Sequence, residues 1–177
     1  AGAQQATVEV VPASYTVPNI GSIFSANVTV QGVENLYGYE FKLFYSNDIL
    51  NGTSVTQGPF LKTGGASTFF YVAAFTDGYN ATHGILNVVC LRTATNATGV
   101  NGTGTLATVT FKSVSANGPR SLILADVKLS DPNSTPIPYA ALDGEVTVLP
   151  EFPATLLIPI FMALTLVAIM LSKKTGN

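Results

Sequence analysis

The chain has 177 residues and a formal net charge of −2, from 8 Lys and Arg against 10 Asp and Glu. No basic cluster interleaved with aromatic residues occurs that could follow a phosphate backbone, which excludes nucleic acid as an expected partner. The single cysteine excludes an internal disulfide framework, and with the single histidine it excludes metal sites of clustered His and Cys ligands within one chain. No cofactor is expected.

The chain begins Ala1-Gly2-Ala3-Gln4-Gln5, without an initiator methionine or a charged and apolar leader. We interpret this start as the mature N-terminus of an exported protein. Only 10% of the residues are charged, against about a quarter in typical domains, so we expect another hydrating group on the surface.

Alternation with a period of two recurs before residue 150 and predicts an all-β domain. It is clearest at 36–45, where alternate residues from Tyr37 to Tyr45 are aromatic or aliphatic and Glu40 and Lys42 lie between them. The odd-numbered face of this strand is therefore predicted to be core. Further strands are predicted at 7–11, 23–31, 68–75, 84–91, 105–112, 121–124 and 144–149.

Turn signals such as Asn51-Gly52 separate these strands at regular intervals. Short strands with this punctuation predict an antiparallel β-sandwich of the jelly-roll type. No low-complexity linker or repeat divides the chain before residue 150, so a single domain is predicted over 1–149. The proline-containing junction that follows begins a separate C-terminal segment, 150–177.

The densest aromatic cluster outside the 36–45 strand comprises Phe69, Phe70, Tyr71, Phe75 and Tyr79. Neighbouring residues of a strand point to opposite faces, so Phe70 faces away from Phe69 and Tyr71, and at least one large ring is expected to be exposed. Phe70 and Tyr71 are therefore candidates for a surface that binds carbohydrate or another subunit. The alternative is that neighbouring segments cover both sides of this strand.

Acceptor triplets for N-linked glycans, Asn-X-Ser/Thr, are dense before residue 150. Several are expected to be occupied, and their glycans would hydrate a surface that is poor in charge. The alternative is that some triplets arise by chance in a chain rich in Thr and Asn. Asn51, Asn96, Asn101 and Asn133 fall in stretches that predict loops. The six acceptors are Asn27, Asn51, Asn80, Asn96, Asn101 and Asn133.

Side chains that carry catalytic chemistry are scarce. His83 and Cys90 are separated by an odd number of positions around one predicted strand, which places them on opposite faces and argues against a nucleophile pair. Cys90 is expected in the core and His83 in an exposed turn. No paired carboxylate motif, phosphate loop or serine elbow occurs, so the protein is not expected to be an enzyme.

Three aspartates late in the chain, Asp126, Asp131 and Asp143, lie near predicted turns. They are either ordinary turn residues or contributors to a calcium site with backbone carbonyls. No metal site is assigned on this pattern alone.

The C-terminal segment contains an uncharged run at 152–171 that is closed by Lys173 and Lys174. Twenty helical residues span about 30 Å, the thickness of a bilayer's hydrocarbon core. A hydrophobic α-helix is predicted, and the positive-inside bias would leave 1–149 outside the cell. Such a helix sits either in lipid or in the core of a polymer. Its apolar contacts are assigned to Phe152, Leu156, Leu157, Ile160, Phe161, Leu164, Val167 and Leu171.

The order of the segments resembles the cohesin family of extracellular β-sandwich modules, particularly the cohesin-like domains of archaeal surface proteins, over about residues 6–149. The resemblance implies a β-sandwich, and in cellulosomes cohesins bind the calcium-loaded dockerin of another protein. This chain has no duplicated dockerin-type Asp/Asn loop. The resemblance is carried by the segments 8–12, 24–30, 36–50, 58–61, 102–112 and 143–148.

The junction Pro150-Glu151-Phe152-Pro153, with the apolar run and the lysine pair behind it, resembles archaeal C-terminal surface-sorting signals that carry a Pro-Glu-Phe motif. Some members of that class are cleaved near the motif and transferred to a lipid, and the resemblance implies that the same processing could apply to this chain.

Together these patterns predict a non-enzymatic, glycosylated structural or interaction protein of the cell surface. In the first hypothesis, copies assemble into an extracellular filament or sheath with C-terminal helices in the core and β-sandwiches outside. In the alternative, a single membrane helix anchors a binding module whose partner is a dockerin-like protein or a carbohydrate. The expected partners are thus the protein itself or another cell-surface protein.

Overall fold

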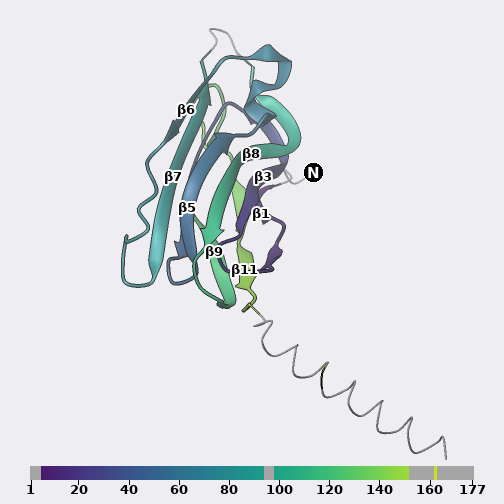
Figure 1. Ribbon diagram of the computed structural model, residues 1–177. Helices are drawn as coiled ribbons and strands as arrows, with labels where there is room; N and C mark the ends of the chain where they lie inside the picture. The colour runs from purple at the N-terminus through teal and green to yellow at the C-terminus, as the bar shows by residue number, and fades with distance from the viewer. Residues whose placement is uncertain (1–4, 94–97, 152–161, 163–177) are drawn as a thin grey trace, which may run out of the picture.

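The computed structural model describes residues 5–93, 98–151 and 162, and it shows a sandwich of two β-sheets (Figure 1). A 3-10 helix, η1 (Phe60–Gly65), connects two of the strands. The first sheet has the order β10 (Tyr139–Leu142), β1 (Ala6–Val11), β3 (Ile23–Leu36), β8 (Val100–Ser113) and β5 (Leu50–Gln57). The second sheet has the order β2 (Ser14–Val17), β11 (Gly144–Val148), β9 (Asn117–Ser130), β4 (Gly38–Ser46), β7 (His83–Arg92) and β6 (Thr68–Val72).

The core lies between the inner faces of the two sheets. In β4 the odd-numbered residues from Tyr39 to Tyr45 are buried, while Glu40 and Lys42 are half-exposed, which confirms the predicted core face. Tyr37, which was assigned to the same face, lies before the strand. The ring of Tyr45 in the second sheet lies 5.2 Å from that of Phe111 in the first, so aromatic packing joins the two layers.

Three strands were not predicted: β2, β5 and β10. The prediction of a turn at Asn51-Gly52 is wrong, because both residues belong to β5. The glycine serves a packing requirement instead: a Cβ at position 52 would lie 1.9 Å from Cδ1 of Phe75. Gly52 therefore makes room for an aromatic ring that the β6–β7 connection places against the core.

The sandwich is not purely antiparallel, because β1 pairs in parallel with β10 and β2 pairs in parallel with β11. The chain segment that forms β1 and then β2 passes from the first sheet to the second. The segment that forms β10 and then β11 makes the same passage in the same direction. Two segments that cross side by side in one direction pair in parallel in both sheets. Alternation within each strand carries no signal for this arrangement.

Of the hydrophobic helix predicted at 152–171, only Met162 belongs to the described part of the chain, and all the apolar contact residues assigned to this helix lie outside it. In the residues that the structure describes, no helix combines the length and apolar character needed to cross a membrane.

Candidate partner-binding face

The outer face of the second sheet carries large apolar side chains that do not reach the core. Phe69, Tyr71 and Tyr79 each keep more than half of their surface exposed (53%, 54% and 53%), and Leu91 keeps 37%. Phe44 lies half-buried beside Tyr79 on the same face. We call these five residues the aromatic patch. Exposed apolar clusters of this kind mark interaction sites more often than single exposed residues do.

Strand register builds one half of the aromatic patch. In the antiparallel pair of β6 and β7, Phe69 lies opposite Leu91 and Tyr71 lies opposite Val89. Because neighbouring residues face opposite ways, Phe70 points inward, where it is half-buried and packs against the core. Of the two residues predicted for a surface, Tyr71 is exposed, whereas the outward ring beside it is Phe69 rather than Phe70.

The β6–β7 connection supplies the other half. Tyr79 packs edge-on against Phe44, with ring centroids 5.7 Å apart. Asp77 holds this connection in place, since its carboxylate accepts hydrogen bonds from the Tyr45 hydroxyl and from the Gly52 amide. Asn47 Nδ2 donates to the carbonyl of Asp77 at 2.9 Å. The position of Tyr79 is therefore fixed by contacts to the core strands.

Two ion pairs lie on the same face, between β4 and β9. Lys42 Nζ lies 2.6 Å from Asp126 Oδ2, and Lys128 Nζ lies 2.9 Å from Glu40 Oε2. The hydrogen bond from Lys42 lowers the pKa of the Asp126 carboxyl, and the same contact raises the pKa of Lys42. These four charges neutralise one another, so the aromatic patch is bordered by a strip without net charge.

A bulge in β9 aims the Asp126 side chain. The register between β4 and β9 shifts between Glu40 and Lys42, and Asp126 adopts a positive φ of 48°. Aspartate is one of the few residues besides glycine that is enriched in this left-handed region. The extra residue brings its carboxylate to Lys42.

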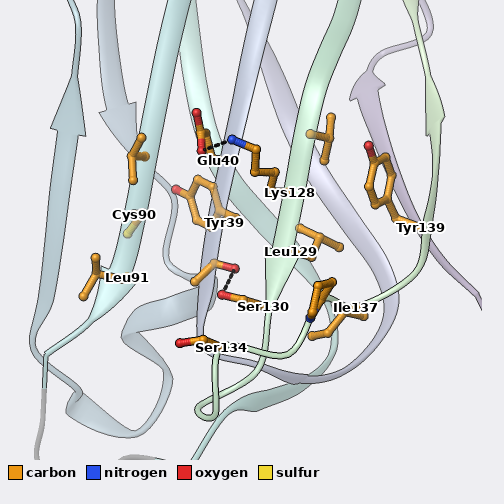
Figure 2. Close-up of a pocket in the computed structure, with 14 residues that line it drawn as sticks. Tyr39, Glu40, Cys90, Leu91, Lys128, Leu129, Ser130, Ser134, Ile137 and Tyr139 are labelled. Atoms are coloured by element: carbon orange, nitrogen blue, oxygen red, sulfur yellow. Dashed lines mark hydrogen bonds and ion pairs between the residues drawn. The ribbon is translucent and has the colours of Figure 1, made fainter.

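A hollow of about 390 Å³ lies at the Gly38 end of these strands (Figure 2). Residues from β4, β7, β9 and the β9–β10 connection line it, among them Leu91, Leu129 and Ile137, with the Glu40–Lys128 ion pair on its border. A Cβ on Gly38 would lie 3.1 Å from the Ser130 hydroxyl, so the missing side chain contributes to the hollow. The lining offers apolar contact and carries no nucleophile beside a base.

The residues considered for chemistry are separate. Cys90 is buried and burial raises the pKa of its thiol, while the His83 ring packs against Phe44 on the outer side of the sheet. Asp126 binds Lys42, Asp131 accepts amide hydrogen bonds from Asn133 and Thr135, and Asp143 accepts one from Leu124. The three aspartates thus serve separate local contacts. Across the described ranges, no group of three or more His, Cys, Asp or Glu could hold a metal ion.

The outer face of the first sheet is mainly polar in contrast, with Ile23 as an exposed apolar exception at the start of β3. Thr108 Oγ1 donates to Asn27 Oδ1 at 2.7 Å, and the hydroxyls of Ser25 and Thr110 lie 2.9 Å apart. Asn27 is half-buried in the middle of β3. Hydroxyl and amide contacts between neighbouring strands therefore cover this face.

The other predicted glycan acceptors are exposed wherever the structure describes them. Asn80 and Asn133 lie in connections between strands, whereas Asn51 and Asn101 lie in β5 and β8. The expectation that the last two occupy loops is wrong, because the strands continue through their glycine-containing triplets. Asn96 lies outside the described residues.

The two-layer fold and an exposed apolar face without catalytic groups define a β-sandwich interaction module. The family model of the cohesin domain matches residues 8–148. The chain belongs to the cohesin family, whose members are non-catalytic protein–protein interaction modules, typically extracellular or at the cell surface. No curated protein matches the sequence.

Solved structures agree on the fold at low sequence identity. A non-cellulosomal cohesin from the hyperthermophilic archaeon Archaeoglobus fulgidus is 18% identical, with a TM-score of 0.65 over 82% of this chain and 92% of that one. A cohesin from Clostridium thermocellum, solved in a type I cohesin–dockerin complex, is 12% identical, with a TM-score of 0.67 over 82% of this chain and 100% of that one. A type II cohesin of the Acetivibrio cellulolyticus cellulosome is 18% identical, with a TM-score of 0.64 over 81% and 95% of the two chains.

The sequence contained signals for part of this face. Alternation along 68–72 places Phe69 and Tyr71 on the opposite side of the strand from Phe70. It does not indicate which of the two sides is covered by the other sheet. Phe44 is the apolar exception on the Glu40 and Lys42 side of its strand, which is the sequence signal for its place on the outer face. Leu91 could not be assigned from its own strand, because its exposure depends on the short strand beside it.

Proposed function

We propose that this protein is a cell-surface interaction module that binds a dockerin-like partner protein through the aromatic patch. The observation that carries the proposal is the exposure of Phe69, Tyr71 and Tyr79 on one face of a rigid sheet. Aromatic side chains contribute much of the binding energy at protein interfaces because they bury large areas at low entropic cost. Related cohesins that were solved with dockerins support this class of partner.

The charge pattern favours a protein partner with an apolar contact surface. The nearest charges, those of Glu40, Lys42, Asp126 and Lys128, are already paired within the chain. A highly charged ligand would have to disrupt these ion pairs. An apolar helix or strand of a partner protein can pack on the aromatic patch and leave the ion pairs intact at the edge of the interface. The border charges are then expected to set register more than affinity.

The test is calorimetric titration with a calcium-loaded dockerin domain from the same organism. Phe69→Ala and Tyr71→Ala should each weaken binding about tenfold or more, as expected for interface hot spots. Thr110→Ala on the opposite face is the matched control and should leave affinity unchanged. Binding that ignores both aromatic substitutions would reject this face, and binding that survives a calcium chelator would count against a dockerin.

Carbohydrate is the alternative ligand for the same rings. Phe69 and Tyr71 lie on one face of β6, and a row of exposed aromatic side chains can stack on sugar rings. Retention on an insoluble polysaccharide that is lost in Tyr71→Ala, in a protein that binds no dockerin, would favour this alternative.

A second candidate function is assembly into an extracellular filament or sheath with C-terminal segments in the core. The uncharged run at 152–171 and its short junction to the last strand support it. Electron microscopy of material sheared from the cell surface, with mass spectrometry across 151–177, is the test. Regular filaments with an intact tail would support assembly, while intact monomers found only in detergent-extracted membrane would support a single-pass anchor.

N-linked glycans are proposed at the exposed acceptors Asn51, Asn80, Asn101 and Asn133. Asn27 is the least accessible acceptor, because it is half-buried in the middle of β3, whereas the other four are exposed. Glycopeptide mass spectrometry of protein from the native cell surface should find the exposed sites modified more fully than Asn27. Full occupancy of Asn27 would show that modification precedes folding.

A further inference from the structure

Each sheet has two edge strands, and three of the four carry features that block pairing with another chain. β2 has four residues between Pro12 and Pro18, and β10 has four residues that follow Pro138. β5 is interrupted by a register shift between Gly52 and Ser54. Short length, nearby prolines and bulges are the devices by which proteins protect sheet edges.

The fourth edge, β6, is one residue longer than β2 and β10 and has neither a nearby proline nor a bulge. Its five residues pair with β7 in continuous register, from Thr68 opposite Arg92 to Val72 opposite Val88. No charged residue and no proline occurs from position 63 to position 76, and no asparagine occurs between Asn51 and Asn80 that could carry a glycan beside it. In Figure 1, β6 forms the outer margin of the second sheet. An uncharged, aromatic edge strand without a bulge is open to pairing.

The ladder with β7 fixes which backbone groups face outward. The Ala73 amide donates to the Asn87 carbonyl, and the Thr93 amide donates to the Ser67 carbonyl. Antiparallel strands alternate between hydrogen-bonded and non-hydrogen-bonded pairs, so Phe69 and Tyr71 also bond to β7. The amides and carbonyls of the intervening residues, Thr68, Phe70 and Val72, therefore point to the free edge.

We propose that two copies of this chain associate through β6, antiparallel about a twofold axis at Phe70, and so continue the second sheet from one subunit into the other. With this axis, Phe70 pairs with its own symmetry mate, Thr68 of the first subunit pairs with Val72 of the second, and Val72 of the first pairs with Thr68 of the second. Each of these three pairs exchanges two backbone bonds, about six in all. The pairing uses the three outward-facing residues and leaves the bonds to β7 intact.

The side chains match the same axis. Phe69 of one subunit faces Tyr71 of the other in non-hydrogen-bonded pairs, where side chains approach most closely. Aromatic cross-strand pairs stabilise such contacts, and no like charges oppose each other across the axis. The two aromatic patches then join into one continuous face. A second copy thus fits this edge through both backbone and side chains.

The first experiment removes one outward amide. The full-length chain in nonionic detergent is measured by sedimentation over a range of concentrations as wild type, Val72→Pro and Val72→Ala. Proline removes the Val72 amide hydrogen without breaking a bond to β7, and alanine keeps it. The dimer dissociation constant should rise at least tenfold for Val72→Pro and change little for Val72→Ala. A wild-type chain that stays monomeric, or a dimer that Val72→Pro does not weaken, overturns the proposal.

A second experiment reports the register even if the proline variant fails to fold. The double variant Phe69→Cys with Tyr71→Cys should form a disulfide-linked dimer on mild oxidation, because these positions face each other across the axis. Each single variant is a matched control and should crosslink far less. Cys90 is buried and does not compete. Equal crosslinking of single and double variants would contradict the register. Dockerin titration of Val72→Pro separates this association from partner binding.

Discussion

At the residue scale, the residue type required at some positions of this sandwich depends on contacts with residues that are distant in sequence. Gly52 accommodates Phe75, and Asp126 adopts a left-handed conformation that brings its carboxylate to Lys42. Neither requirement is visible in the local pattern around the residue. Both lead to measurable consequences.

The Gly52 position should tolerate no side chain. A Cβ would lie 1.9 Å from the Phe75 ring, so Gly52→Ala forces the ring or β5 to move and should cost about 1–3 kcal/mol of unfolding free energy. Gly78→Ala in the β6–β7 connection is the control, because no atom lies within 4 Å of its added Cβ. Urea unfolding measures both. Equal stability of the two variants would show that Phe75 does not occupy the space above Gly52.

The Lys42–Asp126 contact should be visible by titration. The pKa of Asp126 is lowered by Lys42, so the contact's contribution to stability is present above the carboxyl's unfolded pKa and is lost as the pH falls through its folded pKa. Lys42→Met should raise the Asp126 pKa toward its ordinary value in a carbon-detected NMR titration. The Asp131 pKa, lowered by backbone amides of Thr135 and Asn133, should not move. A fixed Asp126 value would exclude Lys42 as the cause.

The raised pKa of Lys42 has the opposite sign. Its contribution is present below the unfolded pKa of lysine and is lost as the pH rises through the folded pKa. The Lys42–Asp126 ion pair therefore contributes to stability across the neutral pH range, and this contribution is lost at both low and high pH. Because both groups are exposed to solvent, its effect on stability is small and is reduced by salt.

At the element scale, β6 is distinguished from the other described edge strands by its continuous register and by the absence of a nearby proline. Hydrogen exchange followed by NMR should find the Phe69 and Tyr71 amides protected at all protein concentrations, because they bond to β7. The Phe70 and Val72 amides should gain protection only as concentration rises and a second copy covers them. Concentration-independent exchange at Phe70 would contradict strand pairing between copies.

At the scale of the whole molecule, the two outer faces have different chemistry around one shared core. Hydroxyls and amides line most of the outer face of the first sheet, with Ile23 as an apolar exception, and aromatic rings lie beside neutralised charges on the second. This asymmetry is the reason that the proposed partner-binding face lies on the second sheet. The core beneath both faces is common, so stability and binding should be separable by substitution.

Phe111 and Tyr71 provide the matched pair for that separation. Phe111 is fully buried and contacts the rings of Phe24, Tyr45 and Phe75, so Phe111→Ala should cost about 3–5 kcal/mol of a total of about 5–15 kcal/mol. Tyr71→Ala should change stability by about 0.5 kcal/mol or less, since it is an exposed surface residue. Denaturant unfolding measures both. A large loss for Tyr71→Ala would make this ring a structural element rather than a contact surface.

Local alternation determined the all-β class and the core face of β4, because the period of two is a property of the strand itself. It also separated Phe69 and Tyr71 from Phe70, since parity within a strand needs no knowledge of neighbours. The segment order was enough to indicate the cohesin family, because core and turn positions along the chain carry that resemblance.

Only the tertiary structure decided which side of β6 is covered, that two strand pairs run in parallel, and that Asn51 and Gly52 belong to a strand. Each of these depends on contacts between segments far apart in sequence: β6 on β7, β1 on β10, and Gly52 on Phe75. Alternation along a strand assigns each residue to one of two faces, but it does not identify the buried face. The neighbour that covers one of them decides whether a ring becomes core or contact surface.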